Sequence, residues 1–87
     1  MRTGIFVGSF DPFTIGHKSV VDRVLPLFDR VVIGVGVNER KQYMLTTEER
    51  VAAIRQLYAD DERVVVESYS DLTVDFAQRH DAQFVVK

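Results

Sequence analysis

Residues 5–17 read IFVGSFDPFTIGH, and this stretch decides the fold of the chain. Its first three residues form an apolar run that predicts a strand buried on both faces. Gly8 and Pro12 then punctuate a tight turn, and a helical pattern begins near Gly16. A helix N-terminus carries unpaired backbone N–H groups and a positive dipole end, which favour an anion. The first hypothesis for this stretch is therefore a phosphate-binding loop.

Several side chains of the turn suit an anion, although each also has a simpler explanation. Ser9 adds a hydroxyl, and His17 lies in the first helical turn, where it can donate to a phosphate. Ser9 could equally serve only the strand-to-helix turn, and His17 could be a satisfied helical residue. The carboxylate of Asp11 is better explained as an acceptor of local N–H bonds than as a ligand. The combination of these residues is more specific than any one of them.

Composition limits the classes of protein that fit. The chain has 87 residues, of which 46% are hydrophobic and 28% charged, as in one small globular domain. Lys and Arg number 11 against 13 Asp and Glu, so we expect no broad nucleic-acid-binding face. The first apolar run is too short for a signal peptide or a membrane span, and a chain without cysteine suits a reducing compartment. We therefore predict a cytoplasmic protein without nucleic-acid or membrane partners.

Strand and helix patterns alternate along the rest of the chain. Pro26 should end or kink the first helix within its last turn. Thr46 and Glu49 predict a capping box for the second helix, and Ser70 and Asp71 predict a cap for the third. The predicted strands span 2–7, 31–37, 64–66 and 84–86, and the predicted helices span 16–28, 47–58 and 71–80.

This alternation predicts an α/β fold with a doubly wound, Rossmann-like parallel sheet of order 3-2-1-4. The first two helices should cover one face of the sheet, and the third helix the other. Gly34 and Gly36 suggest that another group packs closely on the second strand. The last strand would lack a covering helix, and natural proteins seldom leave such an edge bare. We therefore expect residues 1–87 to form one domain that is incomplete at its C-terminus, or that another chain covers.

Ligands of doubly wound sheets bind beyond the carboxyl ends of the strands, where the strand order reverses. Four segments leave predicted carboxyl ends: residues 8–17, the loop that carries Lys41, the turn at 71–73, and Lys87. We expect all four to line one crevice. Cationic groups that converge on a hydroxyl-bearing loop suit phosphate transfer.

Residues 8–17 also match the signature G-[ST]-F-D-P-x-T-x-G-H. The chain thereby resembles the nucleotidyltransferase superfamily with a T/H-x-G-H motif, and within it the phosphopantetheine adenylyltransferase family. The resemblance implies adenylyl transfer from ATP to 4′-phosphopantetheine, giving dephospho-coenzyme A and pyrophosphate in coenzyme A biosynthesis. It also implies Mg²⁺ bound with ATP, and a homohexamer. It covers the whole chain but only the N-terminal part of the family fold.

The resemblance implies a role for each residue that matches the family motifs. Ser9 and the backbone of Phe10 would approach ATP, and Ser9 would also contact the phosphate of phosphopantetheine. His17 would touch ATP and stabilise the transition state, and Lys41 would bridge both phosphates. A phosphate monoester is already ionised near neutrality, so in-line attack on the α-phosphorus needs no general base.

Two further substrate-binding residues follow from the same resemblance. Thr73 would line the pantetheine arm. Lys87 stands where most relatives carry the arginine of an R-G-[LI]-R motif, and its ammonium lacks the bidentate fork of a guanidinium. No residue of the chain is implied as a metal ligand.

Two alternatives stay open. One is another nucleotidyltransferase with the same motif, acting on nicotinamide mononucleotide or glycerol 3-phosphate. The other is a truncated chain that binds phosphate ligands but is catalytically inert. The Lys41 loop followed by TTEER at 46–50 favours the phosphopantetheine reaction over the first alternative, and the missing C-terminal half of the family fold is the feature that bears on the second. Within that run, Glu48, Glu49 and Arg50 are explained most simply by helix capping and a solvated face, and His80 by the dipole at a helix end.

Overall fold

The structure is a computed structural model that describes residues 1–38 and 40–86. The predicted alternation of strands and helices is confirmed. A short 3₁₀ turn, η1, follows the first helix. In chain order the elements are β1 (Thr3–Gly8), α1 (Ile15–Val24), η1 (Leu25–Leu27), β2 (Arg30–Gly36), α2 (Thr47–Leu57), β3 (Val64–Tyr69), α3 (Thr73–Arg79) and β4 (Phe84–Val86).

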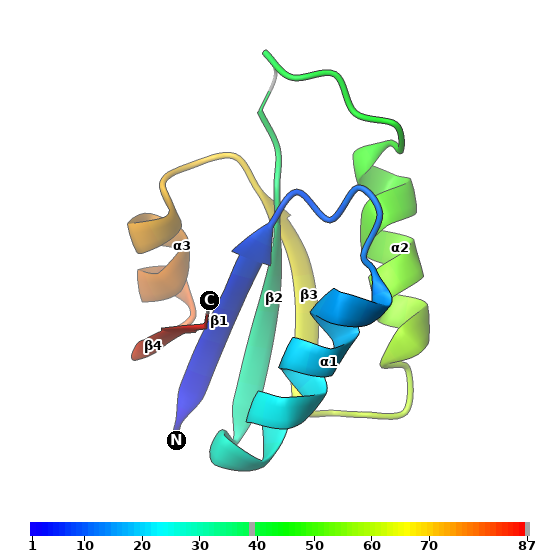
Figure 1. Cartoon of the computed structure of the whole chain (residues 1–87). Coiled ribbons are helices and arrows are strands. Elements are labelled where there is room, and N and C mark those ends of the chain that lie inside the picture. The colour runs from blue at the N-terminus through cyan, green and yellow to red at the C-terminus, as the bar shows by residue number, and fades with distance from the viewer. Residues whose placement is uncertain (39, 87) are drawn as a thin grey trace.

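The strands form one parallel sheet of order β3-β2-β1-β4, as the sequence predicts. In this register Ile5 of β1 lies beside Val32 of β2 and Val85 of β4. Helices α1 and α2 lie on one side of the sheet and α3 lies on the other (Figure 1). The parallel strands bring the turn after β1, the loop after β2 and the turn after β3 to the same edge of the sheet.

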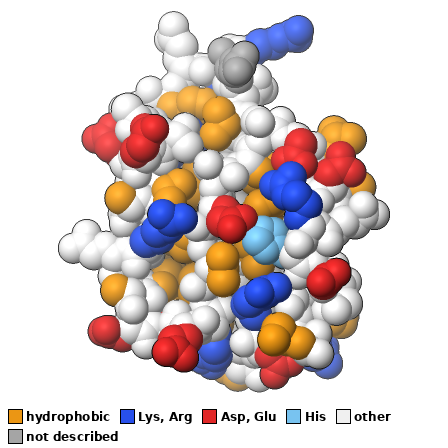
Figure 2. Space-filling view, turned by 180° about the vertical axis from the view of Figure 1, so that it is seen from behind, with side chains coloured by type: hydrophobic (Ala, Val, Ile, Leu, Met, Phe, Trp, Pro, Cys, Tyr) orange, Lys and Arg blue, Asp and Glu red, His pale blue; other side chains and the backbone are white. Residues whose placement is uncertain are grey.

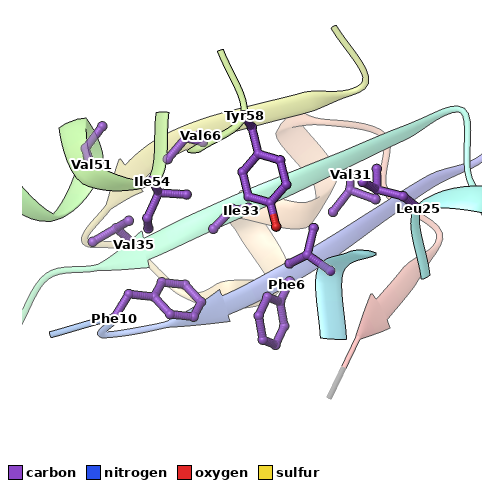
Figure 3. Packing of buried hydrophobic residues seen from close by; sticks show 11 residues of the cluster. Phe6, Phe10, Leu25, Val31, Ile33, Val35, Val51, Ile54, Tyr58 and Val66 are labelled. Carbon is purple, nitrogen blue, oxygen red and sulfur yellow. The ribbon is translucent and has the colours of Figure 1, made fainter. Parts of the chain in front are cut away.

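The hydrophobic core is divided by the sheet into two unequal parts. The larger part fills the space between the sheet and the pair α1 and α2, and Figure 3 shows its side chains gathered there. The smaller part lies under α3 and consists of Ile5, Val32 and Phe76. The buried members of the larger part are Phe6, Phe10, Val21, Leu25, Val31, Ile33, Val35, Val51, Ile54, Tyr58 and Val66.

Close packing on the second strand is confirmed at Gly34. The ring of Phe76, which is fully buried, lies directly against this glycine. A Cβ atom at position 34 would lie 2.5 Å from a ring carbon of Phe76 and 3.0 Å from one of Tyr69. The rings of Tyr69 and Phe76 stack with centroids 4.4 Å apart. Only a residue without a side chain allows α3 to approach the sheet this closely.

The predicted effect of Pro26 and the predicted capping box are confirmed, whereas the predicted end of the first helix at residue 28 is wrong. Helix α1 ends at Val24, and Pro26 lies in the 3₁₀ turn that follows, since proline cannot donate to the helical ladder. Helix α2 begins with the predicted capping box. The Glu49 N–H donates to Thr46 Oγ1 at 3.1 Å, and the Thr46 N–H donates to Glu49 Oε1 at 3.0 Å.

The predicted cap of the third helix is wrong. The N-cap of α3 is Leu72, which makes no side-chain capping bond. The carboxylate of Asp71 instead pairs with the guanidinium of Arg79, at the far end of the same helix. The Asp71 carboxylate thus bonds a guanidinium and not the N–H groups at the helix start, because a charged donor attracts it more strongly. The helix begins at Thr73.

The surface carries charges of both signs. On the face shown in Figure 2, acidic and basic side chains alternate and exposed hydrophobic groups lie between them. No continuous basic surface is seen on that face. Among the helices in the described part of the chain, none has the length and apolar character that crossing a membrane requires.

Candidate functional site

A cavity of about 300 Å³ opens at the carboxyl edge of the sheet. Ser9 follows β1, Lys41 lies in the loop after β2, and Asp71 and Thr73 follow β3. Three of the four predicted segments therefore converge, and the fourth, Lys87, lies outside the described residues. The cavity is lined by Ser9, Gly36, Val37, Asn38, Lys41, Tyr43, Tyr69, Asp71, Leu72 and Thr73.

Sequence reasoning missed the aromatic wall of this cavity. The hydroxyl groups of Tyr69 and Thr73 lie 3.1 Å apart and share a hydrogen bond. The ring of Tyr69 is held in place by its stack on Phe76. Tyr69 is the last residue of β3, so its place at a strand's carboxyl end is the signal that could have found it. A second, larger hollow of about 600 Å³ between α2 and β3 holds none of the predicted site residues.

Lys41 lies in the loop 37–46 between β2 and α2, whose described residues, 37–38 and 40–46, extend beyond the end of β2 (Figure 1). The Lys41 N–H donates to the Asn38 carbonyl at 3.0 Å, which turns the chain back on itself. The Asn38 N–H in turn donates to Tyr43 Oη at 2.8 Å. These bonds place an exposed ammonium side chain at the rim of the cavity.

His17 does not line this cavity. It lies in the first turn of α1, where Nδ1 accepts a hydrogen bond from the Thr14 N–H at 2.9 Å. Because Nδ1 is an acceptor, a neutral His17 ring carries its proton on Nε2, which can then donate a hydrogen bond. The ring packs among Phe6, Phe10 and Phe13, with centroid distances of 6.2, 5.1 and 5.3 Å.

The turn after β1 lies next to both predicted catalytic groups, His17 and Lys41. Ser9 lines the cavity that Lys41 also lines, and the next residue, Phe10, packs its ring on His17. Phe10 is buried and has a φ of 50°, in the left-handed region that few residues with side chains adopt. The turn therefore presents Ser9 to the cavity and Phe10 to the imidazole.

The sequence suggests that Asp11 accepts N–H bonds within its own turn, but the structure gives it other partners. Its Oδ2 accepts the Met44 N–H at 2.7 Å and its Oδ1 accepts the Leu45 N–H at 2.8 Å. Both donors lie in the loop that carries Lys41. The local explanation of this carboxylate is therefore wrong, because its partners come from a segment that only the fold brings near.

Arg50 is buried, although charge patterning predicts a solvated side chain. It is 1% exposed, and its Nη1 donates to the carbonyl of Ser9 at 2.8 Å and of Gly36 at 3.2 Å. Its guanidinium also lies 4.0 Å from the ring centroid of Tyr43. The helical spacing of Arg50 to Ile54 placed it beside the buried stripe of α2, and this was the available signal. One buried cation therefore joins the carboxyl ends of β1 and β2.

Comparison with known proteins relates the chain to nucleotidyl-transferring enzymes. It is 56% identical over its whole length to phosphopantetheine adenylyltransferases of Phocaeicola vulgatus and Bacteroides fragilis, and 42% identical to that of Clostridium kluyveri. The chain spans 58%, 58% and 53% of the lengths of these relatives.

A solved structure shares the fold. It is a bifunctional NMN adenylyltransferase/ADP ribose pyrophosphatase from Francisella tularensis, with a TM-score of 0.69 and 24% identity over 94% of this chain and 25% of that one. The model of the cytidylyltransferase-like family matches residues 5–87, which include every element from β1 to β4 except the first two residues of β1. The chain therefore belongs to the cytidylyltransferase-like family.

Proposed function

We propose that the protein transfers the adenylyl group of ATP to 4′-phosphopantetheine, giving dephospho-coenzyme A and pyrophosphate. The observation that carries the proposal is the cavity in which Ser9, Lys41 and Thr73 meet at the carboxyl edge of the sheet. Its volume lies at the lower end of the range of small-molecule sites. The relatives at 56% identity, which carry the name of this activity, support the same assignment.

The cavity suits the acceptor substrate. An ammonium group at its rim attracts a phosphate monoester, and the hydroxyl of Ser9 can donate to a phosphate oxygen. Thr73 and Tyr69 offer a part-buried wall with a single hydroxyl pair, which fits the amide-bearing pantetheine arm. Asp71 lies at the same cavity, but its charge is paired with Arg79 and so repels an anion less.

The reaction needs alignment more than proton transfer. The acceptor phosphate is a dianion near neutrality, since its second pKa is about 6. One of its oxygens forms a bond to the α-phosphorus of ATP while the bond to the departing pyrophosphate breaks. Lys41 holds two anions that repel one another, and no group of the chain has to remove a proton.

His17 acts from the other side of the Ser9–Phe10 segment. Its Nε2–H donates to an oxygen of the α-phosphate as negative charge builds there in the transition state. The aromatic packing and the Thr14 bond fix the ring beforehand, so little reorganisation is needed during the reaction. In this arrangement ATP crosses the backbone of Ser9 and Phe10 to reach both His17 and the cavity.

Mg²⁺ would enter with ATP. Among the residues described, no cluster of three or more His, Asp or Glu side chains could hold a metal ion, and the phosphate oxygens of the nucleotide are good ligands for Mg²⁺. The ion would neutralise charge on the triphosphate. A cytoplasmic location and a homo-oligomeric assembly, a homohexamer by resemblance, complete the proposal. Light scattering on the protein at its natural length would measure the assembly.

The test is acceptor specificity in the protein at its natural length. Pyrophosphate release is measured with Mg-ATP and, in turn, 4′-phosphopantetheine, nicotinamide mononucleotide and glycerol 3-phosphate. We expect turnover with 4′-phosphopantetheine alone, and calorimetric binding of dephospho-coenzyme A. Turnover with another acceptor reassigns the substrate. Binding without turnover of any acceptor leaves an inert phosphate-binding protein.

A further inference from the structure

We propose that Asp11 is a positioning residue that sets the place of Lys41 relative to Ser9. The inference rests on the proposed function and concerns the two loops that meet at the cavity. Asp11 belongs to the turn after β1, which carries Ser9. Its two hydrogen-bond partners belong to the loop 37–46, which carries Lys41. The carboxylate therefore joins two segments that line one cavity.

The contact is strong for a solvent-facing site. Each carboxylate oxygen accepts its own backbone N–H, at 2.7 Å from Met44 and 2.8 Å from Leu45. A charged acceptor strengthens such bonds about twofold over neutral ones. Both oxygens of Asp11 already have a protein donor, so the side chain is explained without a metal ion or a ligand.

Two other contacts hold the described residues of this loop, at its start and in its middle. At its start, the Val37 N–H donates to the Tyr69 carbonyl at 2.9 Å. In its middle, Tyr43 receives the Asn38 N–H and lies against the guanidinium of Arg50. At its end, the N–H groups of Met44 and Leu45 donate to Asp11 in the turn after β1. Lys41 lies between these anchors, so the position of its ammonium depends on both ends being held.

Asp11→Asn is the direct test. Asparagine keeps the shape and one acceptor oxygen, but it turns an N–H₂ group toward a backbone N–H and loses that bond. We expect kcat/KM for adenylyl transfer to fall about tenfold, as the loss of a charged hydrogen bond implies. The amide protons of Met44 and Leu45 should exchange with solvent about tenfold faster in the same variant.

A double-mutant cycle with Lys41→Ala separates positioning from general destabilisation. If Asp11 acts through Lys41, Asp11→Asn in the Lys41→Ala protein should cost less than about twofold. A full tenfold further loss would overturn the inference, because Asp11 would then act on its own. Unchanged amide exchange in Asp11→Asn would overturn it as well.

A matched control is available at the opposite end of the sheet. Asp29 Oδ2 also accepts a backbone N–H, from Arg2 at 2.6 Å. Asp29→Asn should leave kcat, KM and the amides of Met44 and Leu45 unchanged. If the unchanged protein shows no adenylyl transfer, the proposed function fails. The inference on Asp11 is then tested without turnover, by amide exchange and by calorimetric binding of dephospho-coenzyme A to the Asp11→Asn and Lys41→Ala proteins. Faster exchange with weaker binding in Asp11→Asn supports it, and unchanged exchange overturns it.

Discussion

The two proposed catalytic groups are held in different ways. His17 is surrounded by three phenylalanine rings and is tied to the start of its own helix. Lys41 lies on an exposed loop that is held by polar contacts at its two ends. Packing against aromatic rings therefore places the imidazole, whereas hydrogen bonds at the ends of a loop place the ammonium. Four variants test this contrast.

The largest effect is expected for Phe10→Ala. Phe10 is 4% exposed and packs on Phe6, Phe13 and His17. Removing a buried phenylalanine ring lowers the free energy of unfolding by about 3–5 kcal/mol. Urea denaturation would measure the change. Phe84→Ala, which removes a ring that is 42% exposed, should cost much less. Equal losses would contradict the role of the Phe10 ring in the core around His17.

His17→Ala should come next and should act on chemistry. We expect kcat to fall about 10²–10³-fold with a small change in KM, because the Nε2–H bond strengthens mainly in the transition state. Steady-state pyrophosphate release measures both constants. His80→Ala is the control, since its Nε2 bonds Glu67 at 2.7 Å on a different part of the sheet. An unchanged kcat in His17→Ala would remove the imidazole from the mechanism.

Lys41→Ala should affect binding and turnover together. Its ammonium faces anions in the ground state as well as in the transition state, so we expect KM to rise and kcat to fall, each about tenfold. The free energy of unfolding should change by less than about 0.5 kcal/mol, because the side chain is exposed. Lys18→Ala removes a surface lysine that pairs with Asp22 and should leave both constants alone. A large loss of stability in Lys41→Ala would contradict the statement that this side chain is exposed and that other residues hold the loop.

The smallest effect at neutral pH is expected for Tyr58→Phe, beside the aromatic group around His17. Burial, and then the carboxylates of Asp22 and Asp61, raise the pKa of Tyr58 above its ordinary value. The unfolded chain therefore loses this proton first, near pH 10, and the folded protein should lose stability as the pH rises further. The free energy of unfolding, measured by urea denaturation at each pH, should be about 1 kcal/mol lower in the variant at pH 7. The two values should converge above about pH 10. A gap that widens with alkali would contradict the assignment.

Local patterns predicted the frame of the fold. The apolar runs, Pro26 and the Thr46–Glu49 capping box depend on neighbours along the chain, so the sequence contains all the information they need. Because all strands were predicted to be parallel, Ser9, Lys41 and Thr73 were expected at one edge of the sheet, and all three line the cavity there.

The misjudged residues are those whose partners are distant. Asp11 bonds residues 33 and 34 positions away, and Arg50 bonds a carbonyl 41 positions away. No neighbour of Asp11 in the sequence indicates its distant partners, and the spacing of Arg50 to Ile54 indicates burial but does not identify the carbonyl groups that it bonds. Asp71 was misassigned because Arg79 competes for its carboxylate from the other end of a short helix. His17 does not line the cavity although it belongs to the same predicted segment as Ser9, and spacing alone does not reveal this.

The contact at Gly34 links the middle of the sheet to the room available for an acceptor molecule. A methyl group at this position would press on Phe76 and Tyr69 at once, and Tyr69 forms part of the cavity wall. The shape of the proposed site for the pantetheine arm thus depends on position 34 having no side chain, although Gly34 itself is not part of the cavity lining. A larger residue there would reshape the cavity wall through two stacked rings and without any contact with the acceptor.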